Sequence, residues 1–280
     1  MSLASFGGKY FIQRVVEKLG LNMFIVWGKK HVYRKIGFVA DFCPMCRSIK
    51  GFLLRRVGLA GHIYYISVGE GDLIGYERTC ENCQTTFNAD ANKYASFCKK
   101  TTSLNDLQRQ TYPALTTDIA ERLELEEKIR NTPNLFSRSE RQDLIFLPFA
   151  LLAPKVERQY ANIQIDKETG FSMLGVIIFF MIIPGFVQNN FPQYAEESLL
   201  FFVALSVILL AWQFLTAGRR FMRKQIIPVL ARALVPLRPT EAEIRLTLED
   251  MKKQKQKIGV KLKINDLMEH LKTIKIANTI

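Results

Sequence analysis

Two stretches of the sequence contain no charged side chain. The first extends from Gly170 to Ala195 and the second from Ser198 to Gly218. The surface of a soluble protein needs polar groups at regular intervals, and neither stretch supplies a polar stripe at helical spacing. The absence of charge therefore argues against a simple soluble enzyme.

Catalytic motifs are also lacking. The sequence has no P-loop, no H-E-x-x-H and no G-x-S-x-G. The Gly-Glu-Gly at 69–71 lacks the spacing of a nucleotide-binding loop, and we interpret it as a hairpin turn. The three histidines, His31, His62 and His270, lie far apart in the sequence, and none is expected to bind a metal. We therefore expect no enzymatic activity.

The charges that are present are unevenly distributed. The chain has 280 residues, a net charge of +13 and 48% hydrophobic residues, so it is not wholly disordered and can form about two modules. Residues 1–100 carry 15 basic and 7 acidic side chains, residues 101–218 carry 9 and 13, and residues 219–280 carry 15 and 6. The basic ends favour an anionic lipid surface as a partner. Nucleic acid is the less favoured alternative, because charge alone gives only non-specific affinity.

The uncharged stretches predict two membrane spans. Phe171–Val187 has 17 residues and Ser198–Gly218 has 21, whereas a helix needs about 20 apolar residues to cross a bilayer. The first run reaches this length if it is extended at either end. A helical hairpin buried in a soluble core is the alternative, which the lack of a polar stripe disfavours. We expect a two-helix transmembrane hairpin over residues 170–218.

The flanking charges predict how this hairpin is oriented. The link Gln188–Glu197 has two acids and no Lys or Arg, whereas Arg219–Arg238 contains six basic residues. By the positive-inside rule, both termini are cytoplasmic in an integral membrane protein with two spans. Phe191, Tyr194 and Trp212 are candidates for the membrane interfaces, and packing on a neighbouring helix is an equal alternative for Trp212.

Four of the five cysteines form two C-x-x-C pairs, Cys43-Pro44-Met45-Cys46 and Cys80-Glu81-Asn82-Cys83. Each pair can present two thiolates from a tight turn, and two such knuckles complete a closed four-cysteine site. The 33 residues between the pairs exceed the usual 15–20 of a zinc ribbon. We expect this excursion to form strands over Phe52–Val57, His62–Val68 and Leu73–Thr79, with turns at Gly58–Gly61 and Gly69–Gly71.

Structural zinc, one ion per chain, is the favoured occupant of this site. Four thiolates leave no open position for water, so the metal would not be catalytic. An iron–sulfur cluster also uses four cysteines, and it remains an alternative. Two disulfides are disfavoured in a reducing cytoplasm, and a redox C-x-x-C normally occurs singly. Cys98 lies outside both pairs, and we interpret it as a spare thiol.

Several motifs occur in one order along this part of the chain. They are FIVWGKK at 24–30, a lone Gly37, Cys43-Pro44-x-Cys46, Leu54-Arg55-Arg56-Val57, Tyr64-Tyr65-Ile66 and Cys80-x-x-Cys83. Their order resembles a small, poorly characterised zinc-ribbon family over about Met23–Tyr94. The resemblance implies a zinc-bound ribbon with ligands Cys43, Cys46, Cys80 and Cys83, and it implies no reaction. The chain departs from the family in lacking a proline-rich strand and in having Gln84, not Gly, after the last ligand.

The remaining segments are expected to be helical. Asp118 can open one helix, Ser139-x-x-Gln142 has the form of a capping box, and Thr240-x-x-Glu243 caps a helix after the second uncharged stretch. The run Leu144–Leu152 is too short to span a membrane and is broken by Pro148. We interpret it as a helix face buried against the domain or lying at the membrane interface.

These observations predict an α+β chain with five segments. They are an amphipathic helix over 1–22, a four-cysteine antiparallel zinc ribbon over 23–100, a helical linker domain over 101–169, a transmembrane hairpin over 170–218 and a basic cytoplasmic helical tail over 219–280.

The expected function is a membrane-anchored binding or scaffold protein that holds a protein partner at the cytoplasmic face of the membrane. One alternative is a homo-oligomeric channel or membrane-perturbing effector with a zinc-ribbon sensor domain. A solute pathway of this kind would need an oligomer lined by Ser172, Ser206, Gln213 or Thr216. A second alternative is a membrane-tethered nucleic-acid binder.

Overall fold

The computed structural model describes residues 27–63, 66–67, 69–161, 166–190 and 195–277. The expected amphipathic helix over 1–22 lies outside these residues, as do Phe191 and Tyr194. The described chain divides into two compact units. The strand unit comprises residues 27–40, Gly51–Glu81 and Thr86–Pro113, and the helical unit comprises Asp41–Lys50, Asn82–Thr85 and the chain from Ala114 onward.

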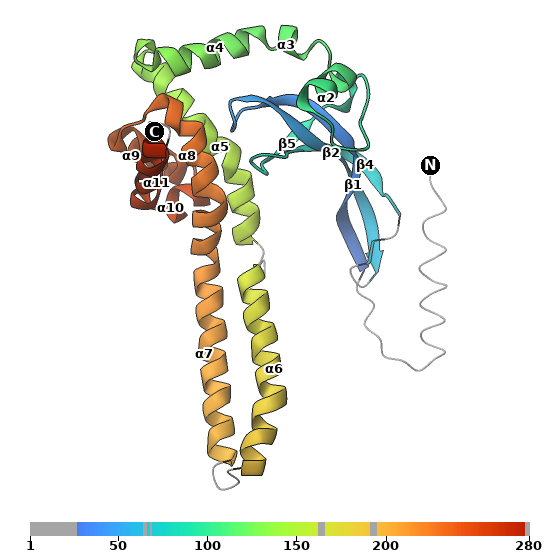
Figure 1. Cartoon of the computed structure of the whole chain (residues 1–280), viewed down its shortest axis with the longest axis vertical. Helices are drawn as coiled ribbons and strands as arrows, with labels where there is room; N and C mark the ends of the chain where they lie inside the picture. Colours follow the sequence, from blue (N-terminus) through green and yellow to red (C-terminus); the bar gives the residue numbers. More distant parts are fainter. Residues whose placement is uncertain (1–26, 64–65, 68, 162–165, 191–194, 278–280) are drawn as a thin grey trace. The chain divides into compact units, whose positions relative to one another are not determined.

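The strand unit is built on a five-stranded sheet (Figure 1). Its strands are β1 (Trp27–Cys43), β2 (Ser48–Ile63), β3 (Ile66–Ser67), β4 (Asp72–Cys80) and β5 (Thr86–Ala89), and the 3₁₀ turn η1 (Ala91–Lys93) and helix α2 (Leu104–Thr111) follow. The strand order is β1-β2-β4-β5, with β3 paired to β2. The pairs of β2 with β3, β2 with β4 and β4 with β5 are antiparallel, which confirms the expected antiparallel character.

The expected turn at Gly58–Gly61 is wrong, because β2 runs straight through it. A bulge interrupts the pairing of β2 with β4 between Val57 and Gly58. A Cβ atom at Gly58 would lie 2.1 Å from the Glu70 carbonyl oxygen, so glycine is needed for close approach of the chain and not for a turn. The turn at 69–71 is confirmed, since Gly69 and Gly71 have positive φ angles of 77° and 67°.

The core of the strand unit lies between the sheet and α2. The side chains of Val39, Phe52, Leu54 and Leu107 are 0–1% exposed. The Thr111 hydroxyl accepts a hydrogen bond from the Ala40 amide at 3.0 Å and donates to the Leu107 carbonyl at 2.7 Å. Leu107 and Thr111 stand one helical turn apart, so α2 presents one face to the sheet.

The helical unit contains twelve further elements among the described residues (Figure 1). They are α3 (Leu115–Asp118), α4 (Ala120–Asn131), η2 (Pro133–Leu135), α5 (Arg138–Ala161), α6 (Lys167–Asn190), α7 (Ala195–Phe221), the π-helix η4 (Met222–Ile226), α8 (Ile227–Leu234), η5 (Val235–Leu237), α9 (Glu241–Lys253), α10 (Lys257–Lys261) and α11 (Ile264–Ala277).

Helix α5 supplies much of the buried surface of this unit. Ile145, Phe149, Leu152 and Val156 are fully buried and recur at the three- and four-residue spacing of one helix face. The interpretation of this run as a buried face is confirmed, but the expected break at Pro148 is wrong. The helix continues through Pro148, which is itself buried, and through Pro154. Packing of the apolar face therefore outweighs the lost backbone hydrogen bond.

Capping side chains fix where two helices begin. At α5 the cap is Ser137, whose backbone N–H donates to Glu140 Oε2 at 2.9 Å, so the box lies two residues before the expected one at Ser139. The expected box of Thr240 and Glu243 at α9 is confirmed. Arg141 on α5 donates to this same Glu243 carboxylate at 2.5 Å, which joins α5 to the start of α9.

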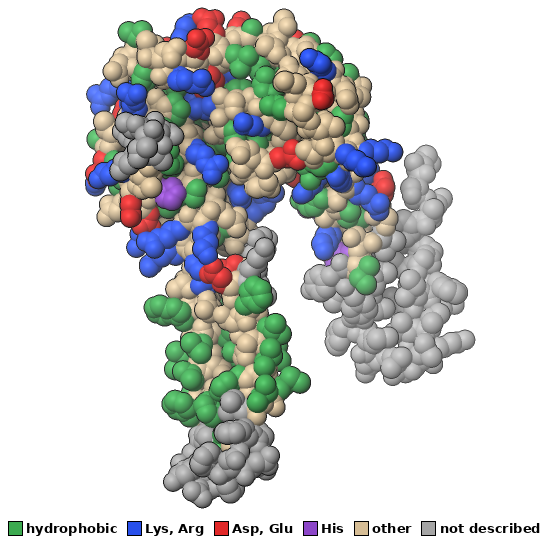
Figure 2. Space-filling model, viewed as in Figure 1, with side chains coloured by type: hydrophobic (Ala, Val, Ile, Leu, Met, Phe, Trp, Pro, Cys, Tyr) green, Lys and Arg blue, Asp and Glu red, His purple; other side chains and the backbone are tan. Residues whose placement is uncertain are grey.

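Helices α6 and α7 lie side by side and carry large exposed apolar side chains (Figures 1 and 2). Met181 is 79% exposed on α6, and Leu215 is 82% exposed on α7. Among the described residues, one helix is long and apolar enough to cross a membrane, Phe201–Leu237. The expected hairpin of two spans is thus reduced to one candidate span, because the described apolar part of α6, Glu168–Ile182, falls short of the required length.

The candidate span contains a π-helix where its surroundings change. The Ile227 amide donates to the Met222 carbonyl, a five-residue step. Pro228 has no N–H to give to the carbonyl four residues before it, which favours a local change of hydrogen-bond pattern. Before this turn the apolar side chains of α7 are largely exposed, whereas Ile226 at its end and Leu230 and Leu234 beyond it are fully buried.

The basic cluster after α7 is paired with acids that lie elsewhere in the sequence. The sequence shows six basic residues in Arg219–Arg238 but gives no sign of these acidic partners. Arg220 Nε lies 3.0 Å from Asp166 Oδ2 and 2.8 Å from Glu168 Oε2. Lys224 is also paired with Glu168, and Arg223 Nη2 lies 2.9 Å from Asp266 Oδ1. These contacts join the start of α6 to the end of α7 and to η4, and they join α11 to η4.

Asp166 predicts an acid-sensitive contribution to stability. Hydrogen bonds from Arg220, and further bonds from Thr169, lower the pKa of the Asp166 carboxyl from 3.8 to about 2, against the opposing effect of burial. A depressed folded-state pKa gives stability that is present above about pH 4 and is lost as the pH falls towards 2. We expect Asp166→Asn to cost about 1 to 2 kcal/mol at pH 7, because both partners are partly exposed.

Thermal unfolding of the wild type and of Asp166→Asn between pH 7 and pH 3 measures this difference. The difference in stability between the two proteins should become smaller as the pH approaches 3. Asp250→Asn removes a more exposed pair with Lys253 and serves as the control, with little effect at any pH. An Asp166→Asn cost that does not change with pH contradicts the assignment.

Candidate metal centre

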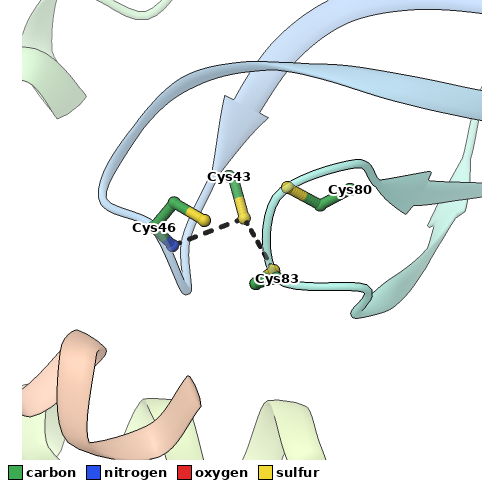
Figure 3. Close-up of side chains that lie close together, drawn as sticks. All are labelled: Cys43, Cys46, Cys80 and Cys83. Atoms are coloured by element: carbon green, nitrogen blue, oxygen red, sulfur yellow. Dashed lines mark hydrogen bonds between the residues drawn. The ribbon is translucent and has the colours of Figure 1, made fainter. Parts of the chain in front are cut away.

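Two turns of the chain bring the four predicted ligands together. Cys43 ends β1 and Cys46 closes the turn that follows it, whereas Cys80 ends β4 and Cys83 closes the second turn. The four Sγ atoms all lie within 4.8 Å of one another. Figure 3 shows the four side chains pointing toward a common centre.

The distances fit a single tetrahedral ion. Sulfur atoms on one zinc ion, each about 2.3 Å from the metal, stand about 3.8 Å apart. Cys43 Sγ and Cys83 Sγ are separated by 3.6 Å, which matches this spacing and is far too long for an S–S bond. In an iron–sulfur cluster the thiolates are shared among two or more irons and must stand further apart, so the compact arrangement favours one ion.

Two of the sulfur atoms accept hydrogen bonds, and a third interacts with a lysine. The Cys46 amide donates to Cys43 Sγ at 3.4 Å, and Asn82 Nδ2 donates to Cys46 Sγ at 3.3 Å. Burial lowers the pKa of the Lys155 ammonium on α5, and the nearby Cys83 sulfur opposes this shift. Cys43, Cys80 and Cys83 are 0–5% exposed. Buried thiolates that receive N–H donors and a nearby positive charge suit a closed structural site.

Each knuckle ends in a residue with left-handed backbone geometry. Arg47, after Cys46, has φ of 53°, and Gln84, after Cys83, has φ of 55°. Such a φ costs a non-glycine residue about 1–2 kcal/mol, so the rest of the turn must hold it in place. Gln84 therefore holds a left-handed geometry that a glycine would adopt without this cost.

The other sequence candidates lie apart from this cluster. Cys98 Sγ donates to Gln110 Oε1 at 3.1 Å, and the Cys98 backbone pairs with Phe38 across an isolated bridge. Within the described chain, the four-cysteine cluster is the one group of three or more His, Cys, Asp or Glu that could hold a metal ion, and it includes no histidine. A zinc ion bound there would hold the two knuckles together and would supply no reactive position.

Comparisons with models of known protein families, with curated proteins and with solved structures found no match to this chain. The resemblance to a zinc-ribbon family therefore rests on the order of its motifs, and the four-cysteine cluster rests on geometry.

Replacing one ligand should distinguish the metal-binding cysteines from Cys98. We expect purified wild-type protein to carry one zinc ion per chain and Cys46→Ser to lose it. The apparent binding energy of structural zinc is on the order of 10 kcal/mol, so the knuckles should unfold with it. Elemental analysis and limited proteolysis measure the two effects.

Cys98→Ser is the matched control, because this thiol lies outside the cluster. It should keep both the zinc and the fold. Zinc loss in Cys98→Ser, or full zinc content in Cys46→Ser, would show that the ligands are assigned wrongly.

Proposed function

We propose that this chain is a membrane-anchored zinc protein that acts as a scaffold for a protein partner at the cytoplasmic face. The observation that carries the membrane part is the exposed apolar surface of α7. Phe201, Ile208, Trp212 and Leu215 are 63–82% exposed. A soluble protein rarely exposes so large a contiguous apolar surface, whereas a bilayer covers it.

Helix α6 is proposed as a second span beside α7. It has 24 residues from Lys167 to Asn190, and Phe179 on α6 contacts Phe202 on α7 with ring centroids 5.1 Å apart. The six basic residues of Arg219–Arg238, against none in Gln188–Glu197, support cytoplasmic termini. The rule counts Lys and Arg, so it holds although three of these cations are paired with acids.

The internal bonding of the polar side chains in α6 and α7 favours a scaffold over a channel. Gln213 Oε1 and Thr216 Oγ1 each accept a hydrogen bond from Arg220 Nη1 at 2.7 Å. The Ser172 hydroxyl donates to the Glu168 carbonyl at 2.9 Å. Groups that line a water-filled pore are expected to face water, and these three are bonded within the molecule.

The metal site supports a binding role in a different way. A closed four-thiolate centre performs no chemistry, and its effect is to fix the backbone around it. The strand unit adds an exposed basic segment, because Lys29, Lys30, Arg34 and Lys35 on β1 are all exposed. Anionic lipid is the proposed partner of these cations, and nucleic acid is the less favoured one.

Charges placed in the middle of α7 should block membrane insertion. Val207 and Ile208 are 61% and 64% exposed, and each lysine there costs roughly 2.5–3.5 kcal/mol of insertion energy. We expect the double variant Val207→Lys, Ile208→Lys to leave the carbonate-resistant membrane fraction. Leu135→Lys changes a still more exposed apolar residue, at 82%, in η2, and this variant should stay in that fraction. Normal insertion of the double variant contradicts a lipid-facing α7.

The oligomeric state should separate a scaffold from a channel. We expect the purified chain in mild detergent to be a monomer or a dimer, because the polar groups of α6 and α7 are bonded within one chain. Native mass spectrometry measures this state directly. A closed ring of four or more copies would support the channel and overturn the scaffold proposal.

A further inference from the structure

The guanidinium of Arg47, the residue after the ligand Cys46, is buried within the helical unit. The Arg47 side chain is 8% exposed and its Nη1 lies 2.8 Å from Glu126 Oε2 on α4. Its Nε donates to the Ala233 carbonyl on α8 at 2.6 Å. Glu126 is itself only 5% exposed. Two buried charges are tolerated when they are paired, so this contact joins the first knuckle to α4 and α8.

A backbone carbonyl at the C-terminal end of α8 needs the hydrogen bond from Arg47. Helix α8 ends at Leu234, and the last four carbonyls of a helix have no partner within it. Ala233 and Leu234 are both 0% exposed, so bulk water does not reach this end of the helix. Arg47 satisfies the Ala233 carbonyl and places a positive charge at the negative end of the helix dipole.

The knuckle determines whether Arg47 reaches that carbonyl. Arg47 has a φ of 53°, and a non-glycine residue gains about 1–2 kcal/mol by leaving this region. Bonds from Cys43 and Cys46 to one metal ion would hold the turn against this relaxation. Without the ion, those bonds no longer oppose the movement of Arg47.

Glu126 has a second partner that allows this movement. Arg122 Nη2 lies 2.7 Å from Glu126 Oε1 and is one helical turn away on α4. The Arg122 guanidinium also lies over the ring of Phe42, 5.4 Å from the ring centroid. Phe42 is the residue immediately before the ligand Cys43. Glu126 therefore keeps a cation when Arg47 leaves, and the buried carboxylate is not left uncompensated.

We propose that Arg47 couples metal occupancy of the four-cysteine site to the order of α8. With metal bound, Arg47 holds both Glu126 and the end of α8. Loss of metal releases Arg47, leaves Glu126 with Arg122 and loosens α8. Since α8 continues α7 through the π-helix η4, a change in the order of α8 would report the availability of zinc to α7. Linkage makes the coupling reciprocal, so loss of Arg47 also weakens metal binding.

Hydrogen exchange of the full-length chain in detergent tests the coupling, with and without removal of zinc by a chelator. In the wild type, we expect zinc removal to speed exchange of the α8 amides at least about tenfold. In Arg47→Gln, α8 should already exchange fast in the zinc-bound form, and removal should change it less than about threefold. Zinc affinity should fall about five- to tenfold in this variant.

Arg141→Gln is the matched control. Arg141 also pairs with a carboxylate, Glu243, and donates to a backbone carbonyl, that of Arg238. Its loss should leave the zinc response of α8 at the wild-type size. If Arg47→Gln does not fold, Glu126→Gln keeps the knuckle sequence and removes the anionic anchor of Arg47, and it should reduce the response in the same direction.

The outcomes separate this inference from the metal site on which it rests. A wild-type chain that takes up no zinc overturns the metal site and the coupling together. If the wild type binds zinc but the exchange rates of its α8 amides do not change when zinc is removed, the coupling alone is overturned. A full zinc response in folded Arg47→Gln, or in Glu126→Gln when that variant replaces it, shows that another residue carries the signal and also overturns the role of Arg47.

Discussion

The meeting of four thiols from two turns is the constraint on which the N-terminal part of the structure depends. The turns are 33 residues apart in the sequence, and the strands between them must return the chain to its starting point. The antiparallel register of β2 with β4 does this by placing Cys80 opposite Phe52, in the strand that follows Cys46. Both turns end in left-handed residues. The sheet therefore brings the ligands together, and a bound metal would hold the strained turns in place.

A second constraint acts where the apolar helices end. Asp166, at the start of α6, pairs with Arg220 at the end of α7, and Asp266, on α11, pairs with Arg223 in η4. These arginines join helices to one another, and in the proposed topology they would also form the positively charged cytoplasmic flank. Charge reversal of the cluster is consequently a poor probe of topology alone, since it would also place like charges against Asp166, Glu168 and Asp266.

The sequence predicted correctly those features that depend on interactions between neighbouring residues. The two C-x-x-C pairs, the Thr240 capping box and the glycine turn at 69–71 are each set by a few adjacent residues, and the structure contains all of them. The errors arose where tertiary packing overrode a local signal. Pro148 does not break α5 because a buried face holds the helix, and Gly58 marks no turn because glycine is needed there for the close approach of the Glu70 carbonyl. The pairing of Arg47 with Glu126, 79 residues apart, leaves no pattern in a single sequence.

At the π-helix Met222–Ile226, the number of residues matters for the packing of the following helix as much as their identity does. One residue more than an α-helical turn is accommodated there, and each residue rotates a helix by about 100°. Deletion of a single residue would restore ordinary helical geometry and turn everything downstream by that angle. Ile226, Leu230 and Leu234, which are fully buried, would then face a different direction from their packing partners. This segment should therefore tolerate changes of side chain more readily than insertions or deletions.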